Sequence, residues 1–198
     1  MTATGDATMP VNAAEPGCPT KTDSQVPPTE PEAALPPLSA HDYKLYNRLA
    51  EHMDLFHNHF RSEWNMLYSS CTAGKRANGQ SIRSFISSGL SFCEHLTFHH
   101  GIEEQRVFPM LARKMPAFRK QDDLVGQHKQ IHKGLEKMES YLEACGSGER
   151  ELRLVELKEI MDSYGKVLWE HLDDEVRTLG AENMRKYWTK EEMMRLRL

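Results

Sequence analysis

The chain has 198 residues, enough for one domain with a tail, and its 25 Lys and Arg against 29 Asp and Glu give a net charge of −4. No basic stripe stands out, which argues against nucleic acid as a partner. Four widely spaced cysteines without a Cys-x-x-Cys pair argue against a disulfide framework and against a thiolate metal site. No apolar run approaches the roughly 20 residues of a membrane span.

The sequence has neither the apolar core of a secretory signal nor the early arginines of a transit peptide, so we expect a cytoplasmic protein, with nuclear access left open. Residues 1–38 contain eight of the ten prolines and no periodic apolar pattern. Such a segment cannot bury enough surface to offset its ordering entropy, which predicts a disordered tail. The sequence leaves open whether this tail is passive or docks a protein partner.

The first predicted helix runs from about Ser39 to about Tyr68. Ser39 followed by Asp42 is typical of an N-cap with an acidic first turn. Its buried face repeats in steps of three and four residues and includes one histidine: Met53, His57, Phe60, Trp64 and Leu67. Glycines and small polar residues predict a loop over 71–79.

The second predicted helix runs from about Ser81 to Lys114, with a kink at Pro109, because proline removes a backbone hydrogen bond and crowds the preceding turn. Pro116 marks its end. Its inward face reads Ile82, Ile86, Gly89, Cys93, Leu96, His99 or His100, Glu103 and Met110.

The third predicted helix covers about Gln121 to Cys145 and is ended by Gly146–Gly148, and the fourth covers about Glu149 to Leu179. The inward face of the third includes Leu124, His128, Ile131, His132 and Leu135, and that of the fourth includes Tyr164, Leu168, His171 and Glu175. Capping-box spacing from Thr189 predicts a last short helix. The sequence therefore predicts an all-α protein, with an antiparallel up-down four-helix bundle over 39–180 and a C-terminal extension over 181–198.

Seven potential metal ligands fall on the inward faces of these helices: His57, His99, Glu103, His128, His132, His171 and Glu175. Three of the helices carry a pair four residues apart, which places both side chains on one face, one turn apart. Burying these groups without a partner would carry a large desolvation cost, and metal coordination removes it. Seven imidazole and carboxylate ligands exceed what one zinc ion needs and suit two carboxylate-bridged ions, with iron predicted first and manganese second.

Four stretches carry a family resemblance. These are His57-Asn-His-Phe-Arg61, His99-His-Gly-Ile-Glu-Glu104, His128-Lys-Gln-Ile-His132 and Trp169-Glu-His-Leu-Asp-Asp-Glu175. They resemble the hemerythrin-like (HHE cation-binding) family over residues of about 40–180. The resemblance implies a non-haem di-iron centre with two carboxylate bridges and a bridging oxo or hydroxo group, with the seven residues above as ligands. Oxygen-carrying members have His-x4-Asp at the end of this pattern, whereas here Val176 follows His171 by five and the carboxylate is Glu175.

Three neighbouring residues, His95, His100 and Glu104, are alternative candidates for the predicted ligand set. His100 and Glu104 are also four apart, but lie about 100° around the helix from His99 and Glu103, so the latter pair is preferred. His95, one turn before His99, is predicted to be a group at the rim. Whether His95 or the His100 and Glu104 pair contributes is open.

Three functions fit the predicted centre. The first is binding or sensing of O2 or NO. The second is a di-iron oxidoreductase (an oxidase, peroxidase or ferroxidase) that acts on a small molecule, and the third is a regulator of iron homeostasis. The sequence indicates neither a substrate nor an oligomeric state.

Overall fold

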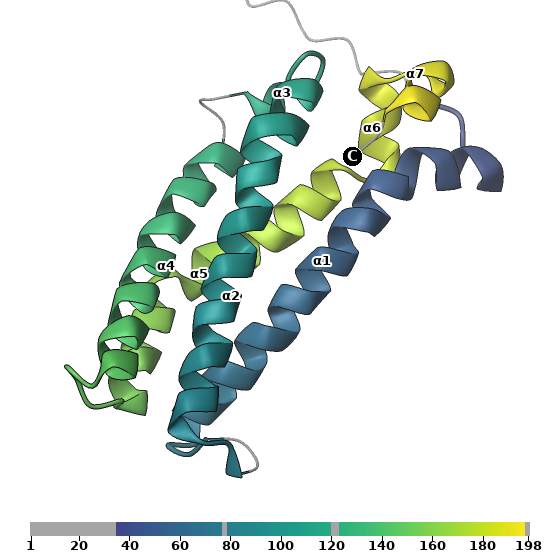
Figure 1. Cartoon of the computed structure of the whole chain (residues 1–198). Helices are drawn as coiled ribbons and strands as arrows, with labels where there is room; N and C mark the ends of the chain where they lie inside the picture. The colour runs from purple at the N-terminus through teal and green to yellow at the C-terminus, as the bar shows by residue number, and fades with distance from the viewer. Residues whose placement is uncertain (1–34, 77–78, 120–122, 197–198) are drawn as a thin grey trace, which may run out of the picture. The chain divides into compact units, whose positions relative to one another are not determined.

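Four long helices form an antiparallel bundle in the computed structural model, which describes residues 35–76, 79–119 and 123–196 (Figure 1). They are α1 (Ala40–Thr72), α2 (Ile82–Ile102), α4 (Asp123–Ser147) and α5 (Leu154–Thr178). Each packs against two others, in the pairs α1–α2, α2–α4, α4–α5 and α5–α1. The described residues contain no strand, and the predicted all-α antiparallel bundle is confirmed.

Local side-chain contacts determine where two of these helices begin. The Ser39 hydroxyl accepts a hydrogen bond from the Asp42 backbone N–H at 3.1 Å, as the N-cap prediction requires. The fourth helix begins at Leu154, not near Glu149, because the Tyr141 hydroxyl accepts from the Arg153 N–H at 2.9 Å and donates to the Arg153 carbonyl at 3.0 Å. The first helix also continues to Thr72, past the predicted end near Tyr68.

The predicted helix from Ser81 to Lys114, kinked at Pro109, differs from the structure after Ile102. Regular α-helix ends at Ile102, a π-helix follows over Glu103–Val107, and α3 covers only Phe108–Leu111. In the π-helix the Phe108 N–H donates to the Glu103 carbonyl, five residues back. Pro109 has no N–H to donate, and the wide turn comes directly before it, so the irregularity lies ahead of the proline.

Two short helices follow the bundle, α6 (Ala181–Tyr187) and α7 (Lys190–Arg195). The predicted helix after Thr189 is confirmed, with both hydrogen bonds of a capping box between Thr189 and Glu192. The sequence did not predict α6. Both helices pack on α1, near its beginning (Figure 1), and Arg48 of α1 donates to the carbonyls of Met193 and Leu196.

Two apolar clusters lie along the bundle. The large cluster includes Phe60, Trp64, Leu96, Ile131, Leu135, Leu168 and Leu172. The end cluster includes Tyr46, Met53, Val107, Phe108, Leu111, Leu124, Leu179, Met184 and Trp188. On α1, α4 and α5, and on α2 with the π-helix that continues it, the transition from one cluster to the other falls at or beside predicted ligands. On α1, for example, Met53 and Phe60 flank His57. A polar layer is therefore enclosed by apolar side chains along the bundle axis.

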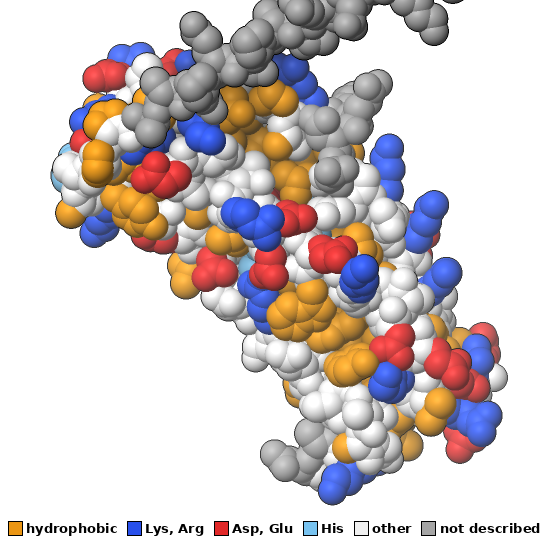
Figure 2. Space-filling model, turned by 180° about the vertical axis from the view of Figure 1, so that it is seen from behind, with side chains coloured by type: hydrophobic (Ala, Val, Ile, Leu, Met, Phe, Trp, Pro, Cys, Tyr) orange, Lys and Arg blue, Asp and Glu red, His pale blue; other side chains and the backbone are white. Residues whose placement is uncertain are grey.

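Lys and Arg side chains are interspersed with Asp and Glu over the face shown in Figure 2. No helix in the described part of the chain is long and apolar enough to cross a membrane. The predicted tail over 1–38 lies outside the described residues, apart from its last four positions, and the residues from Pro37 onward form one compact unit.

Candidate metal centre

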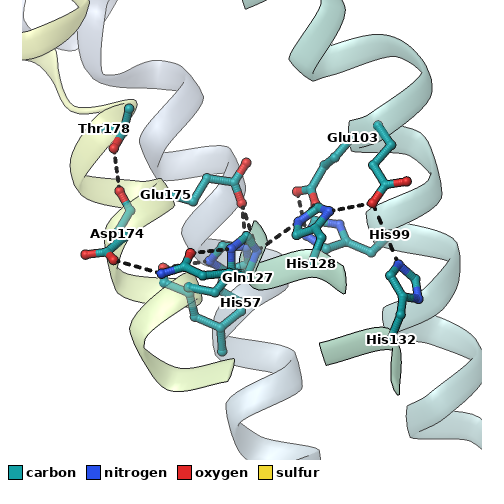
Figure 3. A network of polar contacts seen from close by, with 12 residues as sticks. His57, His99, Glu103, Gln127, His128, His132, Asp174, Glu175 and Thr178 are labelled. Atoms are coloured by element: carbon teal, nitrogen blue, oxygen red, sulfur yellow. Dashed lines mark hydrogen bonds and ion pairs between the residues drawn. The ribbon is translucent and has the colours of Figure 1, made fainter. Parts of the chain in front are cut away.

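Six polar side chains with at most 1% exposure lie in the layer between the two clusters: His57, His100, Glu103, His128, His171 and Glu175. They come from all four long helices and from the π-helix that continues α2. His99 joins them with 11% of its side chain exposed. Figure 3 shows several of these side chains converging between the helices.

The layer contains two groups of side chains with ligand atoms close enough to share an ion. One group is His57, His99 and Glu103, and the other is His100, Glu103, His128 and His171. Glu103 belongs to both, because its Oε1 lies 2.9 Å from His99 Nε2 and its Oε2 lies 3.4 Å from His128 Nε2. One carboxylate therefore spans the two groups.

Glu175 spans the same two groups from α5. Its Oε2 is 3.5 Å from His57 Nε2, in the first group, and 3.6 Å from His171 Nε2, in the second. The Nε2 atoms of His128 and His171 are only 3.1 Å apart. Glu103 and Glu175 therefore both lie between the same two groups of histidines.

Many polar atoms of this layer lack a hydrogen-bond partner within the protein. They are His57 Nε2, His99 Nε2, both ring nitrogens of His100, and both carboxylate oxygens of Glu103 and of Glu175. The 2.9 Å approach of His99 to Glu103 also lacks hydrogen-bond geometry. Leaving a buried polar group unsatisfied costs about 1–3 kcal/mol, more for a charged group. Cations bound between these atoms would satisfy them, so the residues fit a metal centre.

Burial sets the protonation of the histidines. It lowers the pKa of His171 to about 3 and, together with the neighbouring His57, the pKa of His99 to about 4. Burial also lowers the pKa of His100 well below its usual range and, against the opposing effect of Glu104, that of His128. These imidazoles are therefore neutral near pH 7, which is the form that binds metal ions.

The two carboxylates differ in their surroundings. Burial and the nearby Glu175 raise the pKa of Glu103 well above its usual range. Burial also acts to raise the pKa of Glu175, but His57 and His171 outweigh it and hold that pKa low. Positive charge placed between the two carboxylates would favour ionisation of both.

Hydrogen bonds from the second ring nitrogens orient three of the histidines. His57 Nδ1 donates to the Leu172 carbonyl at 2.9 Å, which directs Nε2 into the layer. His128 Nδ1 lies 2.9 Å from Glu104 Oε1. His171 Nδ1 lies 3.3 Å from Gln127 Oε1, and the Gln127 amide donates to Asp174 at 3.2 Å (Figure 3). Such partners fix the ring orientation of metal-binding histidines.

The model of the hemerythrin HHE cation binding domain matches residues 48–181 of this chain. The chain belongs to the hemerythrin HHE cation binding family. The chain is also similar to the "Dimeric xanthone biosynthesis cluster protein R11" of Cryptosporiopsis sp. (strain 8999), with 28% identity over 154 residues. That match covers 73% of this chain and 56% of the relative, so this chain spans little more than half of that protein's length. No solved structure matches.

The HHE domain brings six of the seven predicted ligands together: His57, His99, Glu103, His128, His171 and Glu175. His132 lies at the margin, with 29% of its side chain exposed and its Nε2 3.8 Å from Glu104 Oε1. In Figure 3 its ring is separate from that of His128. His132 belongs to neither of the two groups.

His100, whose contribution the sequence leaves open, lies fully buried in the second group, stacked on His128 with ring centroids 3.9 Å apart. A preference for His99 over His100 rests on a single inward direction for α2. In the HHE domain α2 packs against both α1 and α4, so His99 points toward His57 and Phe60, and His100 points toward His128. Two adjacent histidines, His99 and His100, are the sequence signal that this helix has two buried faces, one toward α1 and one toward α4.

A cavity of about 550 Å³ lies between α1 and α2 and reaches the centre. His99 and Glu103 contribute to its lining, together with the exposed apolar side chains Phe56, Phe98 and Ile102. A second cavity, of about 830 Å³, lies beside Glu104 and His132. The first cavity therefore reaches the centre directly, whereas the second is bordered by Glu104, which contacts His128.

Proposed function

We propose that this HHE domain holds two iron ions in the polar layer and binds dioxygen, or nitric oxide, at that centre. The observation that carries the proposal is that Glu103 and Glu175 each lie between the same two groups of histidines. Imidazole and carboxylate ligands without thiolate suit iron, and bridged iron pairs are an established use of helix bundles. Two ferrous ions would supply electrons and a coordination position for a diatomic ligand.

The surroundings of the centre support a small neutral ligand. Phe60, on the α1 side, is 3% exposed and its ring centroid is 5.0 Å from that of His99. Leu172 and Ile131 lie in the same large cluster. Apolar walls disfavour a charged ligand and hold bulk water away, and they leave a diatomic gas unaffected.

The first test of this proposal is the iron content of the Glu103→Gln and Glu175→Gln variants. The unmodified protein should bind two iron ions per chain, and each variant should bind one or none, because a bridging carboxylate is lost. Glu94→Gln, an exposed position on α2, is the matched control and should keep two. Two iron ions per chain in both Glu103→Gln and Glu175→Gln would contradict the assignment.

The second test concerns the diatomic ligand. The ferrous protein is mixed with oxygen, its optical spectrum is recorded, and the solution is then purged with inert gas. Charge-transfer bands that appear with oxygen and vanish on purging would support reversible binding. Failure of any band to appear in a protein with two bound irons would refute oxygen binding.

A second candidate function is a di-iron oxidoreductase that acts on an aromatic molecule. The cavity between α1 and α2 favours it, because Phe56 and Phe98 line that cavity together with the candidate ligand His99. The name of the relative from Cryptosporiopsis, a xanthone biosynthesis cluster protein, points in the same direction. Repeated oxygen consumption by the iron-loaded protein with 2-naphthol as a probe would support this candidate. Consumption that stops after one oxygen per centre would support binding alone.

A further inference from the structure

A third group of potential ligands lies outside the centre, on the surface formed by α1 and α2. His59 and Glu63 are four residues apart on α1, and His95 faces them from α2. The side chains of His59 and His95 are 59% and 53% exposed, whereas that of Glu63 is 21% exposed. The three residues have no part in the polar layer described above.

The separations between these side chains fit a shared ion better than hydrogen bonds. Glu63 Oε2 is 3.5 Å from His59 Nε2, and Glu63 Oε1 is 3.6 Å from His95 Nδ1. Both distances exceed those of ordinary charge-assisted hydrogen bonds, about 2.7–2.9 Å. Two ligands at about 2.0–2.2 Å from one metal ion are about 3–3.6 Å apart at tetrahedral or octahedral angles.

A second observation points to a ligand. Glu63 Oε2 is buried at the atomic level and has no hydrogen-bond partner. Among the described residues the ion-pair partners of Glu63 are these two histidines alone. This carboxylate oxygen is buried beside two imidazoles without a partner that balances its charge. A bound cation would provide that positive charge.

We propose that His59, Glu63 and His95 form a separate site for one divalent transition-metal ion, which we take to be Zn²⁺. Two imidazoles and one carboxylate are ligands of this class of ion, whereas Ca²⁺ and Mg²⁺ require mainly oxygen ligands. Three protein ligands leave room for water. His59 and His95 also line the cavity that reaches His99 and Glu103, so the ion lies beside the opening that leads to the centre.

The test counts bound zinc. Protein that has first been loaded with iron is equilibrated with Zn²⁺, and both metals are measured per chain. The unmodified chain should bind one more Zn²⁺ than the His59→Ala/His95→Ala double variant, with equal iron in both. The matched control is His41→Ala/His52→Ala, which removes two other exposed α1 histidines and should leave the zinc count unchanged. Equal zinc in the unmodified chain and the His59→Ala/His95→Ala variant would overturn the proposal.

Two further measurements guard against a variant that does not fold. Glu63→Gln preserves the shape of the side chain and should weaken zinc binding by about tenfold or more, since a charged ligand is lost. In the unmodified protein, Zn²⁺ should protect His59 and His95 from diethylpyrocarbonate while His41 stays reactive. Equal modification of His59 and His95 with and without Zn²⁺ would count against the site. The zinc difference does not depend on how much iron the centre holds, so failure of this site and failure of the di-iron proposal are separable.

Discussion

Glu104 is a residue whose effect on the centre is indirect. Its carboxylate is 44% exposed, yet Oε1 lies 2.9 Å from Nδ1 of the fully buried His128. This contact holds the ring so that Nε2 points toward Glu103 and His171. Glu104 therefore positions one candidate ligand from outside the buried polar layer.

We predict that Glu104→Ala lowers iron affinity by about 10- to 100-fold, because partners of this kind typically contribute that much. Competition with a chelator measures the affinity. Glu94→Ala on the same helix should not change it, since that side chain is exposed and outside the centre. An unchanged affinity in Glu104→Ala would show that His128 is oriented by its packing alone.

Two cysteines should be unreactive in the native protein. Burial raises the pKa of Cys71 to about 11 and that of Cys93 to about 12. The thiolate is the reactive form, so at pH 8, well below both values, the reactive fraction is very small. Iodoacetamide followed by mass spectrometry should label these two positions only after denaturation. Rapid labelling of Cys93 in the native state would contradict its placement in the core.

Residue identities in the centre were predictable where a helix has one buried direction and less so where it has two. His57, His128 and His171 each continue a run of core residues in steps of three or four, and the structure brings them together. His99 and His100 lie three and four residues after the buried Leu96, so the spacing does not choose between them, and His100 is buried because α4 packs on that side of α2. His132 keeps the step but lies at the margin of the cavity beside Glu104.

At the scale of helices, two glycines of α4 provide a matched test of packing. A Cβ on Gly134 would lie 2.2 Å from Tyr164 Cγ, and Tyr164 is only 2% exposed, so its ring has little space to move. A Cβ on Gly126 would meet nothing within 4 Å. Close approach of α4 and α5 therefore depends on Gly134 and not on Gly126.

We predict that Gly134→Ala lowers the free energy of unfolding by about 1–3 kcal/mol, the usual effect of overpacking. Gly126→Ala should raise it by about 0.5–1 kcal/mol, because alanine favours the helix. Urea denaturation followed by circular dichroism measures both. Similar changes of the same sign would show that α4 and α5 separate enough to accept the methyl group.

The number and order of the four long helices followed from apolar periodicity and the glycine and proline positions, whereas α6 and two local features did not. The fourth helix begins late because of the Tyr141 hydroxyl, a contact between residues of different helices that no local pattern encodes. The π-helix over Glu103–Val107 widens the helix directly before Pro109, which apolar spacing does not reveal. Such features arise from tertiary structure, which periodicity does not report.

For the whole domain, we predict that removing the metal lowers thermal stability. The polar layer has candidate ligands on every long helix, so bound ions would connect all four. A metal at about 1,000 times its dissociation constant stabilises the fold by about 4 kcal/mol. For a domain of this size that corresponds to a melting temperature higher by roughly 10 °C.

Calorimetry with and without a strong chelator measures this difference. The Glu103→Gln/Glu175→Gln double variant is the control, and chelator should leave its melting temperature unchanged. A chelator effect of equal size in the double variant would place the stabilising ions elsewhere.

The π-helix has a consequence for comparing relatives. A turn closed over five residues contains one residue more than an α-helical turn, so the segment between His100 and Pro109 has one more residue than a continuous α-helix would need to span it. In an alignment, a relative with a regular helix here would show a one-residue gap, and an ungapped comparison would displace every position after it. Searches for this ligand pattern should therefore permit a single insertion between Glu103 and Phe108.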